Sequence, residues 1–168
     1  MDEKFLALIA TFDDETSQEM KEIERILHEA GLVGTQTPGI PHHITLTYYD
    51  HERVDEVKEL AESVSSSTKR FDISFNHIGL FSLKVLFLGP DVNHELLNLY
   101  ERLRVNDVEP EWGWTPHATL LIDDAENIHK ALDLVVQQIR QINGRIESLQ
   151  LYESDPFKLI GEYTLVEK

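Results

Sequence analysis

Apolar positions in the first half of the chain recur with the periods of strands and helices. Residues 5–12 form an apolar run of strand length, and residues 71–75 alternate between apolar and polar side chains as a half-buried strand does. A third strand is predicted from about residue 43 to 50. Two segments between these strands carry apolar residues at helical spacing, the first behind a capping-box pattern at Thr16 and Glu19. The helical positions are Met20, Ile23, Ile26, Leu27 and Ala30, then Val54, Val57, Leu60, Ala61 and Val64.

The second half repeats this order of elements. Its predicted strands are residues 85–88, a segment that starts at His117, residues 146–152 and residues 159–166. One predicted helix is capped by Asn93. The other carries Ile128, Leu132, Val135, Ile139 and Ile142, and stops at Asn143-Gly144.

The order strand, helix, strand, helix, strand therefore occurs twice, which indicates an internal duplication. We expect a single bilobal domain over residues 1–168, with pseudo-repeats of about residues 1–80 and 81–168. A duplicated fold often has a pseudo-two-fold axis, and equivalent strands can then face each other across a central cleft.

Composition and charge exclude several kinds of site. Of the 168 residues, 41% are hydrophobic and 27% are charged, as in an ordinary globular protein. The absence of cysteine excludes disulfides, thiolate chemistry and cysteine-based zinc sites. A formal net charge of −16 argues against a broad nucleic-acid-binding surface, which needs clustered Lys and Arg. We find no signal peptide and no 18-residue apolar run, so we expect a cytoplasmic protein without membrane contact.

Two matching motifs carry the candidate chemistry. Residues 41–46 are Pro-His-His-Ile-Thr-Leu and residues 116–120 are Pro-His-Ala-Thr-Leu. In a strand, a His and a Thr two residues apart project from the same face, roughly 7 Å apart. Proline fits the first residue of a strand or the position before it. The plain alternative is two unrelated strands that each carry one polar residue.

Across the expected pseudo-two-fold axis, the motifs would bring His43, Thr45, His117 and Thr119 into one cleft. Two imidazoles on opposite sides of a phosphorus atom suit cleavage of a phosphodiester. A neutral one takes a proton from water and a protonated one gives a proton to the departing oxygen. The threonine hydroxyls can donate hydrogen bonds to the non-bridging oxygens as charge builds there. This chemistry requires neither metal nor cofactor.

The paired His-x-Thr-Leu motifs resemble those of the two-histidine (2H) phosphoesterase superfamily, which includes the 2′-5′ RNA ligase-like proteins and cyclic nucleotide phosphodiesterases. The resemblance covers essentially the whole chain. It implies an α+β fold with a bilobal duplication, two antiparallel sheets flanked by helices, and a central cleft. The motif residues map onto His43, Thr45, His117 and Thr119 without substitution. The implied activity is metal-independent hydrolysis or transesterification of a small cyclic phosphate or a 2′,5′-linked nucleotide. We expect the protein to be a monomer.

Two other function classes stay open. One is an RNA-end 2′-5′ ligase-like transferase that acts on a short RNA end, which the net charge disfavours. The other is a non-catalytic nucleotide-binding module that keeps both motifs. The sequence does not choose among the substrates, and it does not assign the acid and the base between His43 and His117.

Several other residues have open roles. We expect His42 to point to the face opposite His43 and to be structural or exposed. A metal site built from His42, His43, His117 and either Asp50 or Asp123 is an alternative, although their spacing matches no familiar metal motif. Trp112 and Trp114 could stack on a base or pack between the lobes. Lys158 and Tyr163 could reach a phosphate or lie on a strand surface.

Overall fold

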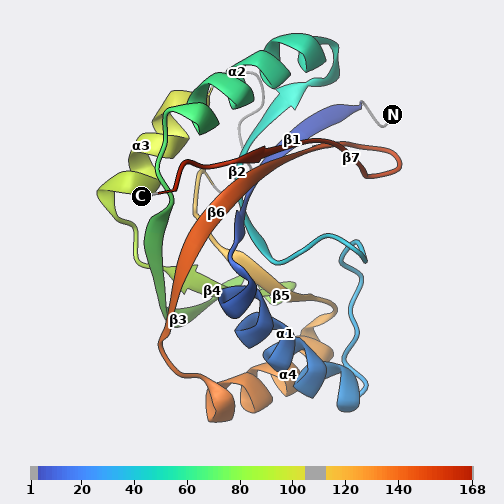
Figure 1. Ribbon diagram of the computed structural model, residues 1–168. Helices are drawn as coiled ribbons and strands as arrows, with labels where there is room; N and C mark the ends of the chain where they lie inside the picture. The colour runs from blue at the N-terminus through green and yellow to red at the C-terminus, as the bar shows by residue number, and fades with distance from the viewer. Residues whose placement is uncertain (1–3, 105–112, 168) are drawn as a thin grey trace.

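The computed structural model describes residues 4–104 and 113–167, which form strands and helices in alternation (Figure 1). The strands are β1 (Phe5–Phe12), β2 (His43–Asp50), β3 (Phe71–Phe81), β4 (Val85–Pro90), β5 (Ala118–Ile122), β6 (Ile142–Glu153) and β7 (Lys158–Thr164). The helices are α1 (Asp14–Glu29), the 3₁₀ turn η1 (His51–Arg53), α2 (Val54–Ser66), α3 (His94–Leu103) and α4 (Ala125–Gln138). The predicted alternation of elements is confirmed.

The strands form one antiparallel sheet in the order β2-β1-β6-β3-β4-β5, with β7 paired to β6. The long strand β6 joins the two halves, because residues 146–153 pair with β1 and residues 142–146 pair with β3. Strand β7 pairs with residues 148–153 of β6. The predicted α+β class, with antiparallel strands flanked by helices, is confirmed. The two expected sheets are continuous with one another through β6.

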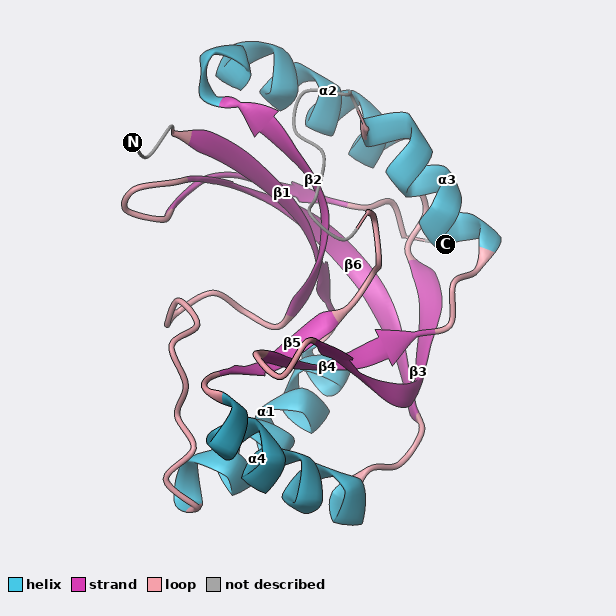
Figure 2. Cartoon of the chain, turned by 180° about the vertical axis from the view of Figure 1, so that it is seen from behind, coloured by secondary structure: helices cyan, strands magenta, loops and turns pink. Residues whose placement is uncertain are grey.

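The topology is symmetric under exchange of the two pseudo-repeats. Exchanging β1 with β4, β2 with β5 and β3 with β6 turns the strand order into its own reverse. The helices obey the same exchange, since α1 packs against α4 at one end of the molecule and α2 packs against α3 at the other (Figures 1 and 2). Each lobe is therefore assembled from both halves of the chain, which is consistent with a duplication.

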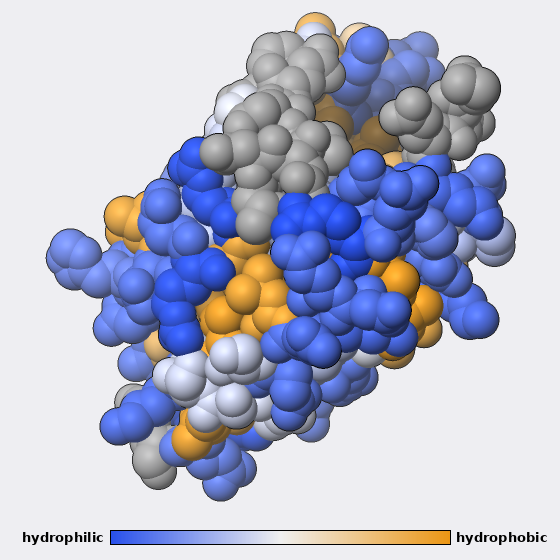
Figure 3. Space-filling view, turned by 90° about the horizontal axis from the view of Figure 1, so that it is seen from above, coloured by the Kyte–Doolittle hydropathy of each residue, from blue (hydrophilic) through white to orange (hydrophobic). Residues whose placement is uncertain are grey.

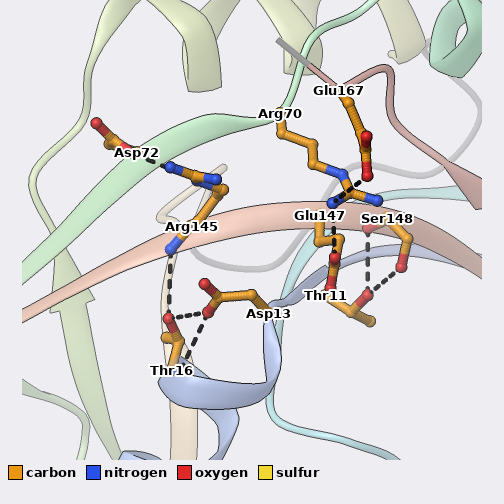
Figure 4. Close-up of polar contacts among 9 residues, drawn as sticks. All are labelled: Thr11, Asp13, Thr16, Arg70, Asp72, Arg145, Glu147, Ser148 and Glu167. Atoms are coloured by element: carbon orange, nitrogen blue, oxygen red, sulfur yellow. Dashed lines mark hydrogen bonds and ion pairs between the residues drawn. The ribbon is translucent and has the colours of Figure 1, made fainter.

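The first helix begins earlier than the capping-box pattern predicts. Its N-cap is Asp13, whose carboxylate accepts a hydrogen bond from the Thr16 amide at 3.1 Å. The Thr16 hydroxyl bonds to the same carboxylate and accepts the Arg145 amide of β6 at 3.3 Å (Figure 4). The predicted role of Thr16 as a cap is therefore wrong. Its hydroxyl joins the helix to the sheet instead.

Helix α4 ends earlier than its apolar spacing predicts. The helix stops at Gln138, and Ile142 belongs to β6, where it pairs with Phe75 of β3. A β-branched residue opposite an aromatic one is a favourable cross-strand pair, and this pairing places the isoleucine in the sheet rather than in the helix. Gly144 does not stop the helix. It lies in β6, where a Cβ atom would clash with the Thr16 side chain.

Alternation along β1 separates the core from the opposite face of the sheet. Leu6, Leu8 and Ala10 are fully buried in the main hydrophobic cluster, which the helices cover. On β2, Tyr49 is also fully buried, and its hydroxyl donates a 2.6 Å hydrogen bond to the Leu103 carbonyl at the end of α3. This bond ties the first motif strand to the helix behind it.

The face of the molecule shown in Figure 3 is mainly polar. Seen from above, hydrophilic side chains dominate, with smaller apolar areas between them (Figure 3). Within the described residues, every helix is too short or too polar to cross a bilayer.

Replacing Tyr49 by Phe should lower the free energy of unfolding by about 1–3 kcal/mol, because it removes the donor for the Leu103 carbonyl in the core. Urea denaturation followed by circular dichroism measures the change. An unfolding midpoint equal to that of the wild type would contradict a stabilising role for this bond.

Candidate active site

A cleft of about 760 Å³ opens on the face of the sheet opposite the main core. His43, Thr45, His117 and Thr119 all line it, so the structure brings together the four residues predicted from the two motifs. The loop between α1 and β2 forms much of the remaining wall. The motif strands β2 and β5 stand at opposite ends of the strand order, yet they contact one another because the sheet curls.

The two imidazoles are held in the same way. The Nδ1 atom of His43 lies 2.7 Å from the Pro41 carbonyl oxygen, and that of His117 lies 2.7 Å from the Thr115 carbonyl oxygen. A carbonyl only accepts hydrogen bonds, so Nδ1 must carry the proton in each ring. This leaves Nε2 as the atom that gains or loses a proton. In each motif, the backbone carbonyl two residues before the histidine thus fixes the tautomer of the ring, and we call this contact the tautomer lock.

Burial favours the neutral form of both rings. It lowers the pKa of His43 to about 4, against the hydrogen bond to Pro41, and repulsion from His117 adds to the decrease. Burial also lowers the pKa of His117, against the hydrogen bond to Thr115. Both imidazoles are therefore mainly neutral in the free protein near pH 7. An anion between them would raise the pKa of both rings and favour protonation of one.

Aromatic rings of the β3–β4 hairpin position His117. Its ring meets Phe81 edge to face at 4.7 Å between centroids, and it lies 5.2 Å from the ring of Phe87. Phe81 and Phe87 also pack against each other at 4.6 Å. These contacts restrict rotation of the imidazole, so the ring keeps one orientation in the cleft.

Matched β-bulges shape the rest of the motif strands. Where β1 pairs with β2, Ile9 lies opposite Thr45 and Leu8 lies opposite Thr47. Leu46 of β2 therefore has no partner in β1 and is the extra residue of the bulge. Where β4 pairs with β5, Leu120 of β5 is the extra residue in the same way. Each bulge shifts the alternation by one, so the cleft is lined by Tyr48 and Ile122 rather than by the residues before them. Burial raises the pKa of the Tyr48 phenol, and a hydrogen bond with Thr45 opposes the rise.

The loop that leads to each motif bonds to the strand of the other motif. The Thr35 amide donates to the Ile122 carbonyl at 2.8 Å, and the Gln36 side-chain oxygen accepts the Ile122 amide at 3.0 Å. In return, the Trp114 indole donates to the Thr45 carbonyl at 3.2 Å. These bonds cap the free edges of β5 and β2 and fix the motif strands relative to each other.

His42 does not point away from the cleft as the strand alternation predicts. It precedes β2, so the alternation does not apply to it, and it lines the cleft wall with its side chain 10% exposed. Its Nε2 atom lies 3.0 Å from a Glu24 carboxylate oxygen on α1. Burial lowers the pKa of His42, and Glu24 opposes this effect. Near pH 7 the ring is therefore mainly neutral, and its contact with Glu24 is a hydrogen bond, which fits the expected structural role.

Of the other candidates that the structure describes, Trp114 packs against α3, and Lys158 and Tyr163 lie outside the cleft lining. Trp114 stacks on Tyr100 of α3 at 3.7 Å and 1°, which fits the packing alternative. Trp112 lies outside the described residues. Lys158 and Tyr163 are not among the cleft-lining residues. In the part of the chain that the structure describes, no group of three or more His, Asp or Glu residues is arranged to hold a metal ion.

Sequence reasoning missed Tyr48, because a strict period of two places its side chain in the core. The break in the alternation is visible in the burial of the residues and not in the residue types. In both copies, two consecutive residues after the threonine are buried, Leu46-Thr47 and Leu120-Leu121. Such a doublet at the same position in both copies is what a bulge shared by the two repeats would produce.

Comparisons with known proteins agree with this fold. A family model described as the 2′-5′ RNA ligase superfamily matches residues 12–156. The crystal structure of E. coli LigT complexed with 3′-AMP has a TM-score of 0.68 and 16% identity, over 98% of this chain and 99% of that chain. A crystal structure of a phosphoesterase has a TM-score of 0.66 and 17% identity, over 98% of this chain and 99% of that chain. The crystal structure of TT0787 of Thermus thermophilus has a TM-score of 0.63 and 14% identity, over 96% of this chain and 97% of that chain. No curated protein matches the chain in sequence.

The tautomer lock can be tested by ¹⁵N NMR of the histidine rings in the free protein. We expect both His43 and His117 to carry their proton on Nδ1 at pH 7. On acidification, His43 should stay neutral until the pH approaches about 4, and His117 should also titrate below its ordinary pKa. A proton on Nε2 in either neutral ring would contradict the backbone lock.

Proposed function

The chain belongs to the 2′-5′ RNA ligase superfamily, and from this premise we propose that it is a metal-independent phosphoesterase for small cyclic phosphates or 2′,5′-linked nucleotides. The coarser statement, that such a chain acts on phosphodiester bonds, follows from the family. The finer one rests on a single observation. Two imidazoles with matching backbone locks line one cleft, and each has a threonine hydroxyl beside it.

In the proposed reaction, His43 is the general base. Its depressed pKa keeps Nε2 free of a proton. Nε2 takes a proton from a water molecule, and the water oxygen forms the new bond to phosphorus. His117 gives its Nε2 proton to the departing ribose oxygen as the old P–O bond breaks. Hydrolysis of a 2′,3′-cyclic phosphate in this way yields a monoester and a free hydroxyl. Exchange with solvent then returns both rings to their starting states.

The acid needs a proton that the free protein holds weakly near neutral pH. A phosphate anion placed between the rings supplies the missing stabilisation, because an opposite charge a few ångströms away favours the imidazolium form. Substrate binding would thus generate the acid. Thr45 and Thr119 would donate to the non-bridging oxygens, where negative charge grows in the transition state.

The size of the cleft and the ligand of a relative support a small substrate. A volume of about 760 Å³ fits a nucleotide. E. coli LigT is complexed with 3′-AMP, which is the kind of monoester that opening a 2′,3′-cyclic phosphate at the 2′ oxygen yields. The net charge of −16 disfavours the alternative of an RNA-end 2′-5′ ligase-like transferase.

A substrate panel separates the remaining alternatives. It includes 2′,3′-cyclic mononucleotides, 2′,5′-linked dinucleotides, cyclic phosphates of ADP-ribose and RNA ends, each assayed for turnover and for binding. Hydrolysis of any of the first three supports the phosphoesterase. Joining of RNA ends would favour the transferase, and binding without turnover would favour the non-catalytic module.

His43→Ala and His117→Ala should each lower kcat by about 10²–10⁴-fold on the best substrate of the panel, because each removes a proton-transfer group. Their circular dichroism spectra should match the wild type. His129→Ala, at an exposed position on α4 outside the cleft, is the control and should keep full activity. Near-wild-type turnover by either cleft variant would exclude the two-histidine mechanism.

Thr45→Val and Thr119→Val should lower kcat by up to about 10²–10³-fold, as loss of one oxyanion donor does. Thr47→Val offers a matched control on β2, since Thr47 is buried and does not line the cleft. If all three variants behave alike, the motif threonines only stabilise the strands.

The pH dependence of kcat/KM should be bell-shaped with its maximum on the acidic side of pH 6.5. Lowering the pH towards 4 protonates the base His43, and raising the pH deprotonates the acid His117, whose pKa is also lowered. The two apparent pKa values that bound the profile belong to the coupled pair of histidines and not to either ring alone. In kcat, the alkaline limb should move to higher pH, because the bound anion favours the imidazolium. Replacing His117 by Gln should remove that limb, and a flat profile from pH 4 to 9 would refute the acid–base pair.

A further inference from the structure

The wall of the cleft carries very little permanent charge. Among the residues that the structure describes, neither lysine nor arginine lines it. The same described lining contains a single carboxylate, that of Glu24 on α1, and four imidazoles, those of His28, His42, His43 and His117. A cleft that would hold a phosphate therefore has a fixed negative charge on its wall, and it gains positive charge only when a histidine is protonated.

The Glu24 carboxylate is held beside the first motif. Its Oε2 atom lies 3.0 Å from Nε2 of His42, and His42 directly precedes His43, the proposed base. A carboxylate only accepts hydrogen bonds, so Nε2 of His42 carries the proton and the negative charge stays on Glu24 while the ring is neutral. The Glu24 side chain is 36% exposed. Water and salt therefore screen its charge in part, and the effect of this charge depends on ionic strength.

The negative charge of Glu24 has no counterpart at the second motif and no cation beside it on the described lining. Pro116 precedes His117 where His42 precedes His43, so the second motif has no imidazole at this position to hold a carboxylate. Lys21, three residues before Glu24 on α1, repels the His42 imidazolium and lowers the pKa of that ring. Its own side chain is exposed and lies outside the cleft lining.

These groups can balance one negative charge on a substrate but not several. A cyclic phosphodiester carries one negative charge, which one protonated imidazole of the pair balances. A phosphate monoester elsewhere on the substrate adds about 1.5 to 2 negative charges near pH 7. The described lining offers no lysine or arginine to this second group, and the Glu24 carboxylate repels it.

We propose that Glu24 is a specificity-determining residue, which restricts the cleft to substrates that carry a single negative charge. The inference rests on the proposed function and narrows it. Nucleoside 2′,3′-cyclic phosphates fit this restriction, as do 2′,5′-linked dinucleotides without a terminal phosphate. Cyclic phosphates of ADP-ribose also contain a diphosphate, and 5′-phosphorylated nucleotides and RNA ends carry further phosphates. The cleft disfavours all of these.

Glu24→Gln tests the inference, because glutamine keeps an oxygen for His42 and removes only the charge. Glu19→Gln is the matched control, since Glu19 is exposed on the same helix and does not line the cleft. Two substrates are compared at low ionic strength, adenosine 2′,3′-cyclic phosphate and its 5′-phosphorylated analogue. The wild type should have the higher kcat/KM on the first. Glu24→Gln should lower the ratio of the two kcat/KM values by about 2- to 20-fold. Glu19→Gln should leave this ratio unchanged, and added salt should lower it in the wild type.

The ratio does not respond to a general loss of activity, so a partly damaged variant still answers the question. A wild type without preference, or equal ratios in Glu24→Gln and Glu19→Gln, would overturn the role of Glu24 while leaving the phosphoesterase intact. If neither substrate is turned over, calorimetric titration with adenosine 3′-monophosphate and adenosine 3′,5′-bisphosphate tests the role without the reaction. Glu24→Gln should then strengthen binding of the bisphosphate more than binding of the monophosphate, unlike Glu19→Gln. Equal changes for both ligands would overturn the inference.

Discussion

The pairing of β3 with β6 is the constraint on which the remaining architecture depends. These two strands lie at the centre of the strand order, and the pseudo-two-fold relation runs between them. The first part of β6 pairs with β3 and the rest of it pairs with β1, so this one strand belongs to both lobes. The curl of this shared sheet brings the edge strands β2 and β5 into contact. The cleft between the motifs is a consequence of that curl.

Reciprocal bonds between the lobes then set the geometry of the cleft. Gln36 and Thr35, in the loop before the first motif, satisfy the backbone of Ile122 in the second. Trp114, before the second motif, satisfies Thr45 in the first. These bonds serve two purposes at once, because they cap polar edges that would otherwise be open and they hold two catalytic candidates on facing strands. The matching locks on the two imidazoles extend the same principle to single side chains.

The sequence was most informative where a pattern occurred twice. The duplicated order of elements predicted two similar lobes, and the repeated His-x-Thr spacing predicted that His43, Thr45, His117 and Thr119 line one cleft, as they do. The α+β class with antiparallel strands followed from the resemblance that these motifs bear to the 2H superfamily. Tertiary competition defeated local patterns elsewhere. Asp13 displaced Thr16 as a helix cap, and pairing with Phe75 drew Ile142 out of a helical pattern into β6. The contact of Phe5 with Phe157 was beyond sequence reasoning, because the two rings meet only through the pairing of β1 with β6.

The exchange of strands between the halves also governs how the chain can fold. Phe5 and Ser154, which bond to each other, are 149 residues apart in the sequence. The lobe that holds the first motif therefore cannot close until β6, near the end of the chain, has been made. Contacts of such long range carry a large loop-closure entropy and slow the search for the native state. During synthesis, β1 and β2 therefore have an unpaired edge until β6 has been made, and an unpaired strand edge favours association with other chains. The net charge of −16 opposes such association by mutual repulsion.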